Sequence, residues 1–131
     1  MARSMTARKM ATGYFLCQAV GVFLWWGMLL QFDPSLQALF FADGVGPAVL
    51  HKFIVPDMLV MGGFSAVAGC LGLLRHRSAI IAGWMACGAT AYALVGAVAV
   101  NWPIGSRPAA DGMMIVSTVG TALAARGLAK P

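Results

Sequence analysis

The stretch that decides the fold is PDMLVMGGFSAVAGCLGLLRHRSAIIAGWMACGATAYALVGAVAV, residues 56–100. It holds most of two apolar runs, 54–74 and 78–100, which are joined by the basic turn Arg75-His76-Arg77. Each run has about 20 residues, the length that an α-helix needs to cross ~30 Å of hydrocarbon. Because the turn is so short, the sequence predicts two antiparallel transmembrane helices that are neighbours.

Two further apolar runs flank this pair. Residues 10–30 are long enough to span a bilayer, and residues 109–125 form a shorter run without charge after Asp111. The whole chain is 60% hydrophobic and only 10% charged, whereas a soluble domain has about 25% charged residues. The sequence therefore predicts a single all-α domain over residues 1–131, an integral membrane four-helix bundle.

The placement of charge predicts the orientation. With four spans, only Lys52 and Arg107 of the nine Lys and Arg residues lie on one side, and the four aspartates lie there too. The basic side should face the cytoplasm. We therefore expect a multi-pass protein of the inner (cytoplasmic) membrane with both termini cytoplasmic. The basic residues on the cytoplasmic side are Arg3, Arg8, Lys9, Arg75, Arg77, Arg126 and Lys130.

Small residues at helical spacing predict the faces on which the helices pack, because lipid provides no hydrophobic reason for helices to associate. The first run offers the stripe Gly13, Cys17 and Gly21, and the second offers the pair Gly62-Gly63. Aromatic residues near the ends of the runs are expected at the two membrane interfaces. They are Trp25, Trp26, Phe32 and Trp102 on the outer side, and Tyr14, Phe15 and Trp84 on the inner side.

The segment between the first two spans is longer than the other connections. Asp33-Pro34 is a favourable helix start, with Asp as N-cap and Pro at the first helical position. SLQALFFA can then form a short helix that lies in the outer interface. The second spanning helix is expected to begin early, near Pro47, and to kink at Pro56.

Asp57 is the residue most suggestive of function. It follows Pro56 at the outer entrance of the second span, where a carboxylate near lipid is costly and should face the protein interior. Two interpretations stay open: an acid in the first turn complements the helix dipole, or the group handles a ligand or a proton.

A polar cap over the outer mouth of the bundle is the predicted ligand site. Such a cap could hold a quinone headgroup or a small anion, and the alternative is simple interfacial anchoring. Its candidate residues are Asp57, His51, Arg107, Asn101 and Trp102.

Most catalytic and cofactor classes lack a signature in this chain. It contains no phosphate loop, no GxSxG, no HExxH and no CxxC motif. His51 could ligate a haem, but His76 lies about a membrane thickness away and cannot complete the site. We therefore expect no metal, no certain cofactor, no nucleic-acid partner and no enzyme activity of the chain on its own.

The order of these features resembles the DoxX-like family of small four-helix membrane proteins. The resemblance covers roughly residues 13–98: a first span that ends near FDP, an amphipathic stretch, a Gly-rich second span, a short basic turn and an Ala-rich third span. Asp57 stands where the family commonly has an acid, while residues 28–31 lack the family's usual Lys or Arg.

The resemblance implies an accessory membrane subunit in electron transfer or quinone-linked metabolism that works with other subunits in the lipid bilayer. The alternative is a structural subunit of a larger membrane complex with no chemistry of its own.

Overall fold

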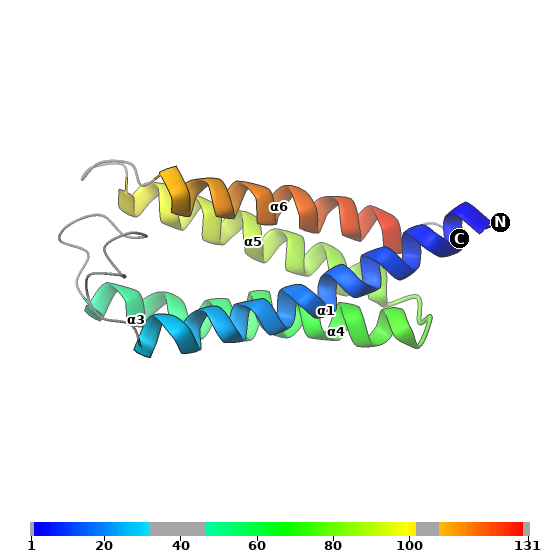
Figure 1. Cartoon of the computed structure of the whole chain (residues 1–131), viewed down its shortest axis with the longest axis horizontal. Coiled ribbons are helices and arrows are strands. Elements are labelled where there is room, and N and C mark those ends of the chain that lie inside the picture. The colour runs from blue at the N-terminus through cyan, green and yellow to red at the C-terminus, as the bar shows by residue number, and fades with distance from the viewer. Residues whose placement is uncertain (1, 32–46, 102–107, 130–131) are drawn as a thin grey trace.

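The computed structural model describes residues 2–31, 47–101 and 108–129. In these residues it contains helices and no strand (Figure 1). The predicted interfacial helix falls in 32–46, outside the described residues. The elements are α1 (Ala2–Gln31), α3 (Pro47–Pro56), η1 (Asp57–Gly62), α4 (Gly63–Leu73), α5 (Ala79–Asn101) and α6 (Pro108–Leu128).

Three helical segments in this part of the chain are long and apolar enough to cross a membrane: Met5–Leu29, Lys52–Leu73 and Ala79–Ala99. They correspond to the first three predicted spans, so the all-α class and the membrane character of the chain are confirmed. The fourth predicted span lies in α6, which is a continuous helix but is not among these apolar segments.

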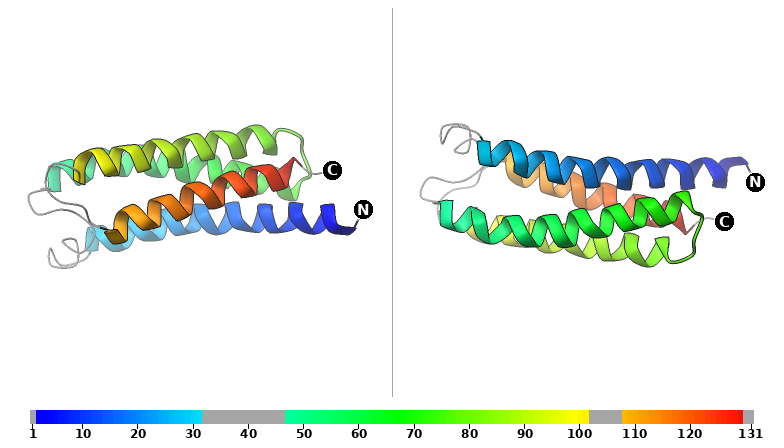
Figure 2. Two further views of the ribbon diagram at one scale, coloured as in Figure 1. Left: turned by 90° about the horizontal axis from the view of Figure 1, so that it is seen from above. Right: turned by 90° about the horizontal axis from the view of Figure 1, so that it is seen from below.

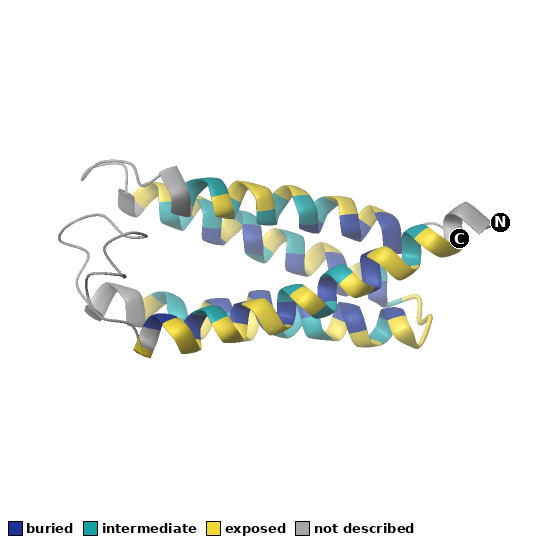
Figure 3. Cartoon of the chain, viewed as in Figure 1, coloured by how far each residue is buried: buried dark blue, intermediate teal, exposed yellow. Residues whose placement is uncertain are grey.

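The helices lie side by side along one long axis (Figures 1 and 2). α1 packs against α4 and α6, and α5 packs against the same two helices from the other side. The start of α1, the turn between α4 and α5, and the end of α6 gather at one end of the molecule (Figure 1). The buried faces point toward the centre of this arrangement and the exposed faces point outward (Figure 3).

The second span begins at Pro47, as predicted, but it continues through Pro56 in helical backbone angles (φ −57°, ψ −45°). Proline has no N–H to donate to the preceding turn. Directly after it, Asp57–Gly62 adopts the wider π-helical register before α4 resumes the α-helix. Such π turns inside α-helices are frequent at functional sites, and this one begins at Asp57.

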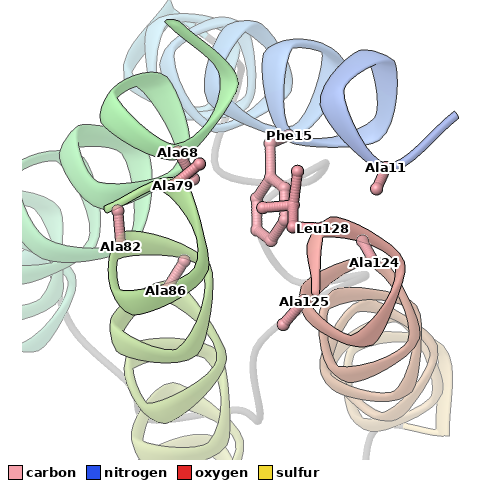
Figure 4. Close-up of a cluster of buried hydrophobic side chains, with 9 residues drawn as sticks. All are labelled: Ala11, Phe15, Ala68, Ala79, Ala82, Ala86, Ala124, Ala125 and Leu128. Atoms are coloured by element: carbon pink, nitrogen blue, oxygen red, sulfur yellow. The ribbon is translucent and has the colours of Figure 1, made fainter. Parts of the chain in front are cut away.

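Alanines and one phenylalanine form the main core cluster. Phe15 of α1 is fully buried and lies beside Leu128 of α6, with small side chains of α4, α5 and α6 around them (Figure 4). Phe15 was predicted at the inner membrane interface; its side chain is enclosed by protein, and its depth in the membrane stays a prediction. The alanines leave room for its ring, which fills the space between the helices. The cluster consists of Ala11, Phe15, Ala68, Ala79, Ala82, Ala86, Ala124, Ala125 and Leu128.

α1 and α4 approach each other closely at Gly69 and Gly72. A methyl group added to Gly69 would lie 2.6 Å from Leu16 Cδ2, and one added to Gly72 would lie 2.5 Å from Thr12 Oγ1. At Gly69 the Leu16 backbone N also lies 3.2 Å from the added methyl group, so α1 would have to shift, whereas at Gly72 the Thr12 side chain would have to move.

The small residues singled out from the sequence lie elsewhere. The stripe Gly13, Cys17 and Gly21 is exposed, so the prediction that it packs within this chain is wrong. Gly62 makes ordinary contact with Phe23 of α1, whereas a methyl group on Gly63 would meet only a backbone oxygen at 4.0 Å.

A polar network joins α1 to α6 inside the protein. The Tyr14 hydroxyl donates to the Ser117 carbonyl (3.0 Å), and Gln18 Nε2 donates to Thr121 Oγ1 (3.0 Å) and to Ser117 Oγ (3.3 Å). Thr121 is fully buried, and its hydroxyl also bonds within its own helix to the Ser117 carbonyl. The network gives the polar residues of α6 partners away from water, as buried polar groups require.

Thr121→Val should lower the stability of the protein in detergent, whereas Thr118→Val should not. The first change removes one of the two α6 hydroxyls that bond to Gln18, the other being that of Ser117, at roughly 0.6 kcal/mol per interhelical bond, with up to about 1.7 kcal/mol for the strongest. Among the described residues, the Thr118 hydroxyl donates only to the Met114 carbonyl of its own helix. Thermal unfolding of the two variants measures the difference, and equal midpoints would show that the network does not couple α1 to α6.

Candidate functional site

Asp57 is buried between α1 and α5. It is the first residue of η1, and its side chain is only 8% exposed. η1 packs against both α1 and α5. At 1.5 Å per residue, Asp57 lies about 7 Å inside the spanning segment that begins at Lys52. The fold therefore holds a carboxyl group at a depth where lipid would otherwise surround it.

The described group that faces this carboxyl from α1 is the indole of Trp26. The indole lies close enough to interact with the Asp57 carboxyl, but no hydrogen bond forms between them, and the buried Nε1 has no hydrogen-bond partner among the described residues. Trp26 is 3% exposed and packs with Val22, Leu29 and Met61. A small shift of either side chain, or a bound polar group between them, would satisfy both.

On its other side, Asp57 lines a pocket of about 260 Å³ between η1 and α5. The wall is almost entirely apolar, with Asp57 as its acidic group. Tyr92 stands at the rim and is 72% exposed, and Gly88 leaves open space in the α5 wall because no atom of the described residues lies within 4 Å of its Cβ position. The pocket is thus open toward the outer surface of the helices. It is lined by Pro56, Asp57, Val60, Met61, Gly88, Ala89 and Tyr92.

The polar cap predicted around Asp57 falls largely outside the described residues. Trp102 and Arg107 lie in 102–107, and of His51 and Asn101 the structure describes only the helical backbone, in α3 and at the end of α5. The cap therefore stays a prediction. Lys52, the other cation near Asp57 in sequence, is exposed.

The structure adds three residues to the site that sequence reasoning missed: Trp26, Gly88 and Tyr92. Trp26 lies near the end of the first span, as predicted, but its side chain is buried against the other helices. A signal was present, because Val22, Trp26 and Leu29 follow the i, i+4, i+7 spacing of one buried helical face.

The chemistry that this arrangement offers is recognition of a polar group at the end of an apolar molecule. A carboxyl group can accept a hydrogen bond when ionised and donate one when protonated. No group of three His, Cys, Asp or Glu side chains in the described ranges could hold a metal ion. The cysteines are free, with Cys17 and Cys70 exposed and Cys87 half-buried, well separated along the chain.

Comparison with protein-family models, curated proteins and solved structures finds no match to this chain. The case for function therefore rests on the geometry of the Asp57 pocket, and the DoxX-like resemblance stays a prediction.

Proposed function

We propose that the protein is an accessory membrane subunit that binds a quinone in the Asp57 pocket and serves membrane electron transfer. The observation that carries the proposal is the pocket itself: a half-open apolar cavity of about 260 Å³ with a buried carboxyl group in its wall. A quinone has the matching shape, a ring with oxygen atoms at its edge and an isoprenoid tail that remains in lipid.

Asp57 suits both oxidation states of such a ligand. The ionised carboxylate accepts a hydrogen bond from a hydroquinone hydroxyl, and the protonated acid donates one to a quinone carbonyl. The Trp26 indole lies on the α1 side of Asp57, away from the pocket, where its N–H can orient the carboxyl group toward the ligand. Tyr92 at the rim can pack its ring against the ligand where the pocket opens.

The proposal includes a four-helix transmembrane bundle, with α6 as the fourth span. α6 packs against α1 and α5 over its length, and its Ser117 and Thr121 are satisfied by Tyr14 and Gln18. A helix of modest hydropathy can reside in a membrane when its polar side chains find partners on a neighbouring helix. In this bundle, α5 forms the second wall of the pocket, and the mouth of the pocket opens toward lipid.

The test is binding of decylubiquinone to the full chain in mild detergent, followed by quenching of tryptophan fluorescence. Gly88→Leu should weaken binding at least about tenfold, because the leucine fills the pocket where the wild type has open space. Asp57→Asn, which keeps the shape but removes the carboxyl chemistry, should weaken it by a similar factor while leaving folding mostly intact. The matched control is Gly13→Leu, since Gly13 is exposed on α1 and has no neighbour within 4 Å of its Cβ position.

Lipid extraction and mass spectrometry of the purified protein separate this proposal from a purely structural role. Bound quinone in the wild type, absent in Gly88→Leu, supports the site. Equal quenching of the wild type and Gly88→Leu, together with stoichiometric large subunits and no extracted quinone, would support the structural subunit instead.

A further inference from the structure

The end of the molecule where both termini lie carries a cluster of basic side chains, which we call the basic end. The two aspartates that the structure describes, Asp57 and Asp111, lie in η1 and in the first turn of α6, toward the opposite end. No described acid therefore neutralises the cluster. The basic end comprises Arg8 and Lys9 of α1, Arg75, His76 and Arg77 of the α4–α5 turn, and Arg126 in the last turn of α6.

Arg8 differs from the other members of the basic end because its guanidinium is partly enclosed. Its terminal NH2 group reaches across to the His76 carbonyl at 3.5 Å, and its Nε is buried without a hydrogen-bond partner among the described residues. A buried donor without a partner is costly. The other four cations, Lys9, Arg75, Arg77 and Arg126, are exposed.

Backbone hydrogen bonds close the turn that faces Arg8. The backbone N–H of His76 donates to the Leu71 carbonyl (2.9 Å), and that of Arg75 donates to the Gly72 carbonyl (3.1 Å). Arg75 is in the left-handed region (φ 52°), where helix ends usually place glycine. Here the residue at the helix end is Arg75, and the left-handed backbone conformation is unfavourable for a residue with a side chain.

Apolar surface adjoins these cations. Met10 of α1 and Leu73 and Leu74 at the end of α4 are all exposed. Arg8 itself lies near the start of the spanning segment Met5–Leu29, at the level of the headgroups. Guanidinium groups above exposed apolar side chains fit a molecule that has both a phosphate and acyl chains.

We propose that Arg8, together with Arg75 and Arg77, binds the phosphate of an anionic phospholipid in the adjacent leaflet. The outer N–H groups of the Arg8 guanidinium donate to the phosphate oxygens in a planar geometry that lysine cannot reproduce, while the buried Nε stays inside the protein. The acyl chains lie along the exposed side chains of α1 and α4. The site is about a membrane thickness from the outer end of the second span and is independent of the Asp57 pocket.

Thermal unfolding of the full chain in detergent tests the site, with phosphatidylglycerol, phosphatidylcholine or inorganic phosphate added in turn. Phosphatidylglycerol should raise the midpoint of the wild type, while the other two should not. Arg8→Gln should weaken the apparent affinity for phosphatidylglycerol about tenfold, the loss typical of one charge-assisted hydrogen bond. Lys9→Gln, the matched control, removes the same charge one residue away from an exposed position and should keep the affinity nearly unchanged.

Three results would overturn the proposal. A midpoint shift of the same size with inorganic phosphate would show a free-anion site, and an equal loss in Arg8→Gln and Lys9→Gln would show only diffuse surface charge. If Arg8→Gln fails to fold, the variant Arg8→Lys, which keeps the positive charge, takes the place of Arg8→Gln in the same assay. Wild-type affinity in Arg8→Lys would then contradict the guanidinium site, and an affinity loss of about tenfold would support it.

Discussion

Gly69→Ala is expected to lower the free energy of unfolding by about 1–3 kcal/mol, the usual cost of overpacking a tight interface. The added methyl group would meet Leu16 at Cδ2 (2.6 Å), Cγ (2.7 Å) and the backbone N (3.2 Å). The end of the Leu16 side chain can move, but its backbone cannot move without shifting α1. The two helices must therefore separate. The change is measured as the midpoint of thermal unfolding in detergent.

Gly63→Ala is the matched control, because it makes the same change in the same helix. Its methyl group would meet only the Met58 backbone oxygen at 4.0 Å. This variant should be unchanged or more stable by about 0.5–1 kcal/mol, because alanine restricts the unfolded chain and favours a helix over glycine. Opposite signs in the two variants would locate the α1–α4 interface at Gly69. Equal midpoints would mean that α1 and α4 do not pack at this position.

Most of the fold follows from the length and hydropathy of the apolar runs. The second and third runs match η1–α4 and α5 closely, because the helix rise and the thickness of a membrane fix the length of a span. The basic turn Arg75-His76-Arg77 marks the end of α4, as predicted, even though Arg75 occupies a position that favours glycine. These features are local, and a single sequence determines them well.

The side on which each helix packs could not be predicted in the same way. Glycine occurs both in tight interfaces, as at Gly72, and on exposed faces, as at Gly13, and composition alone does not distinguish the two. The neighbouring helix makes the difference between the two glycines. Thr12 of α1 lies against Gly72, whereas no atom of the described residues lies within 4 Å of a Cβ position at Gly13. A single sequence also does not show which side chain of another helix faces a buried group, as Trp26 of α1 faces Asp57.

The sequence predicts the buried acid of the candidate site but not the pocket beside it. The cost of a charge near lipid predicts that Asp57 turns inward, and its burial agrees. The pocket beside it depends on Gly88 and Tyr92, which lie one turn apart in α5, more than thirty positions along the chain from Asp57. Only the packing of η1 against α5 brings these residues together.

The number of spans decides on which side of the membrane the C-terminus lies, and we expect four spans. If α6 crosses the membrane, reporter fusions after Lys9, Gly44, His76, Ser106 and Pro131 should alternate in, out, in, out, in. The basic residues at the start of α1, in the α4–α5 turn and at the end of α6 then share the cytoplasmic side.

The decisive fusion is the one after Pro131. α6 is too polar to be recognised by hydropathy alone, but its Ser117 and Thr121 bond to Tyr14 and Gln18 of α1, which removes much of the cost of placing them in lipid. A green fluorescent protein fused there should fluoresce, and alkaline phosphatase at the same position should be inactive, because the first matures in the cytoplasm and the second only outside it. The fusions after Ser106 should give the reverse result and so control for expression. Active phosphatase after Pro131 would place Arg126 outside and leave the chain with three spans, and the transmembrane four-helix bundle would have to be abandoned.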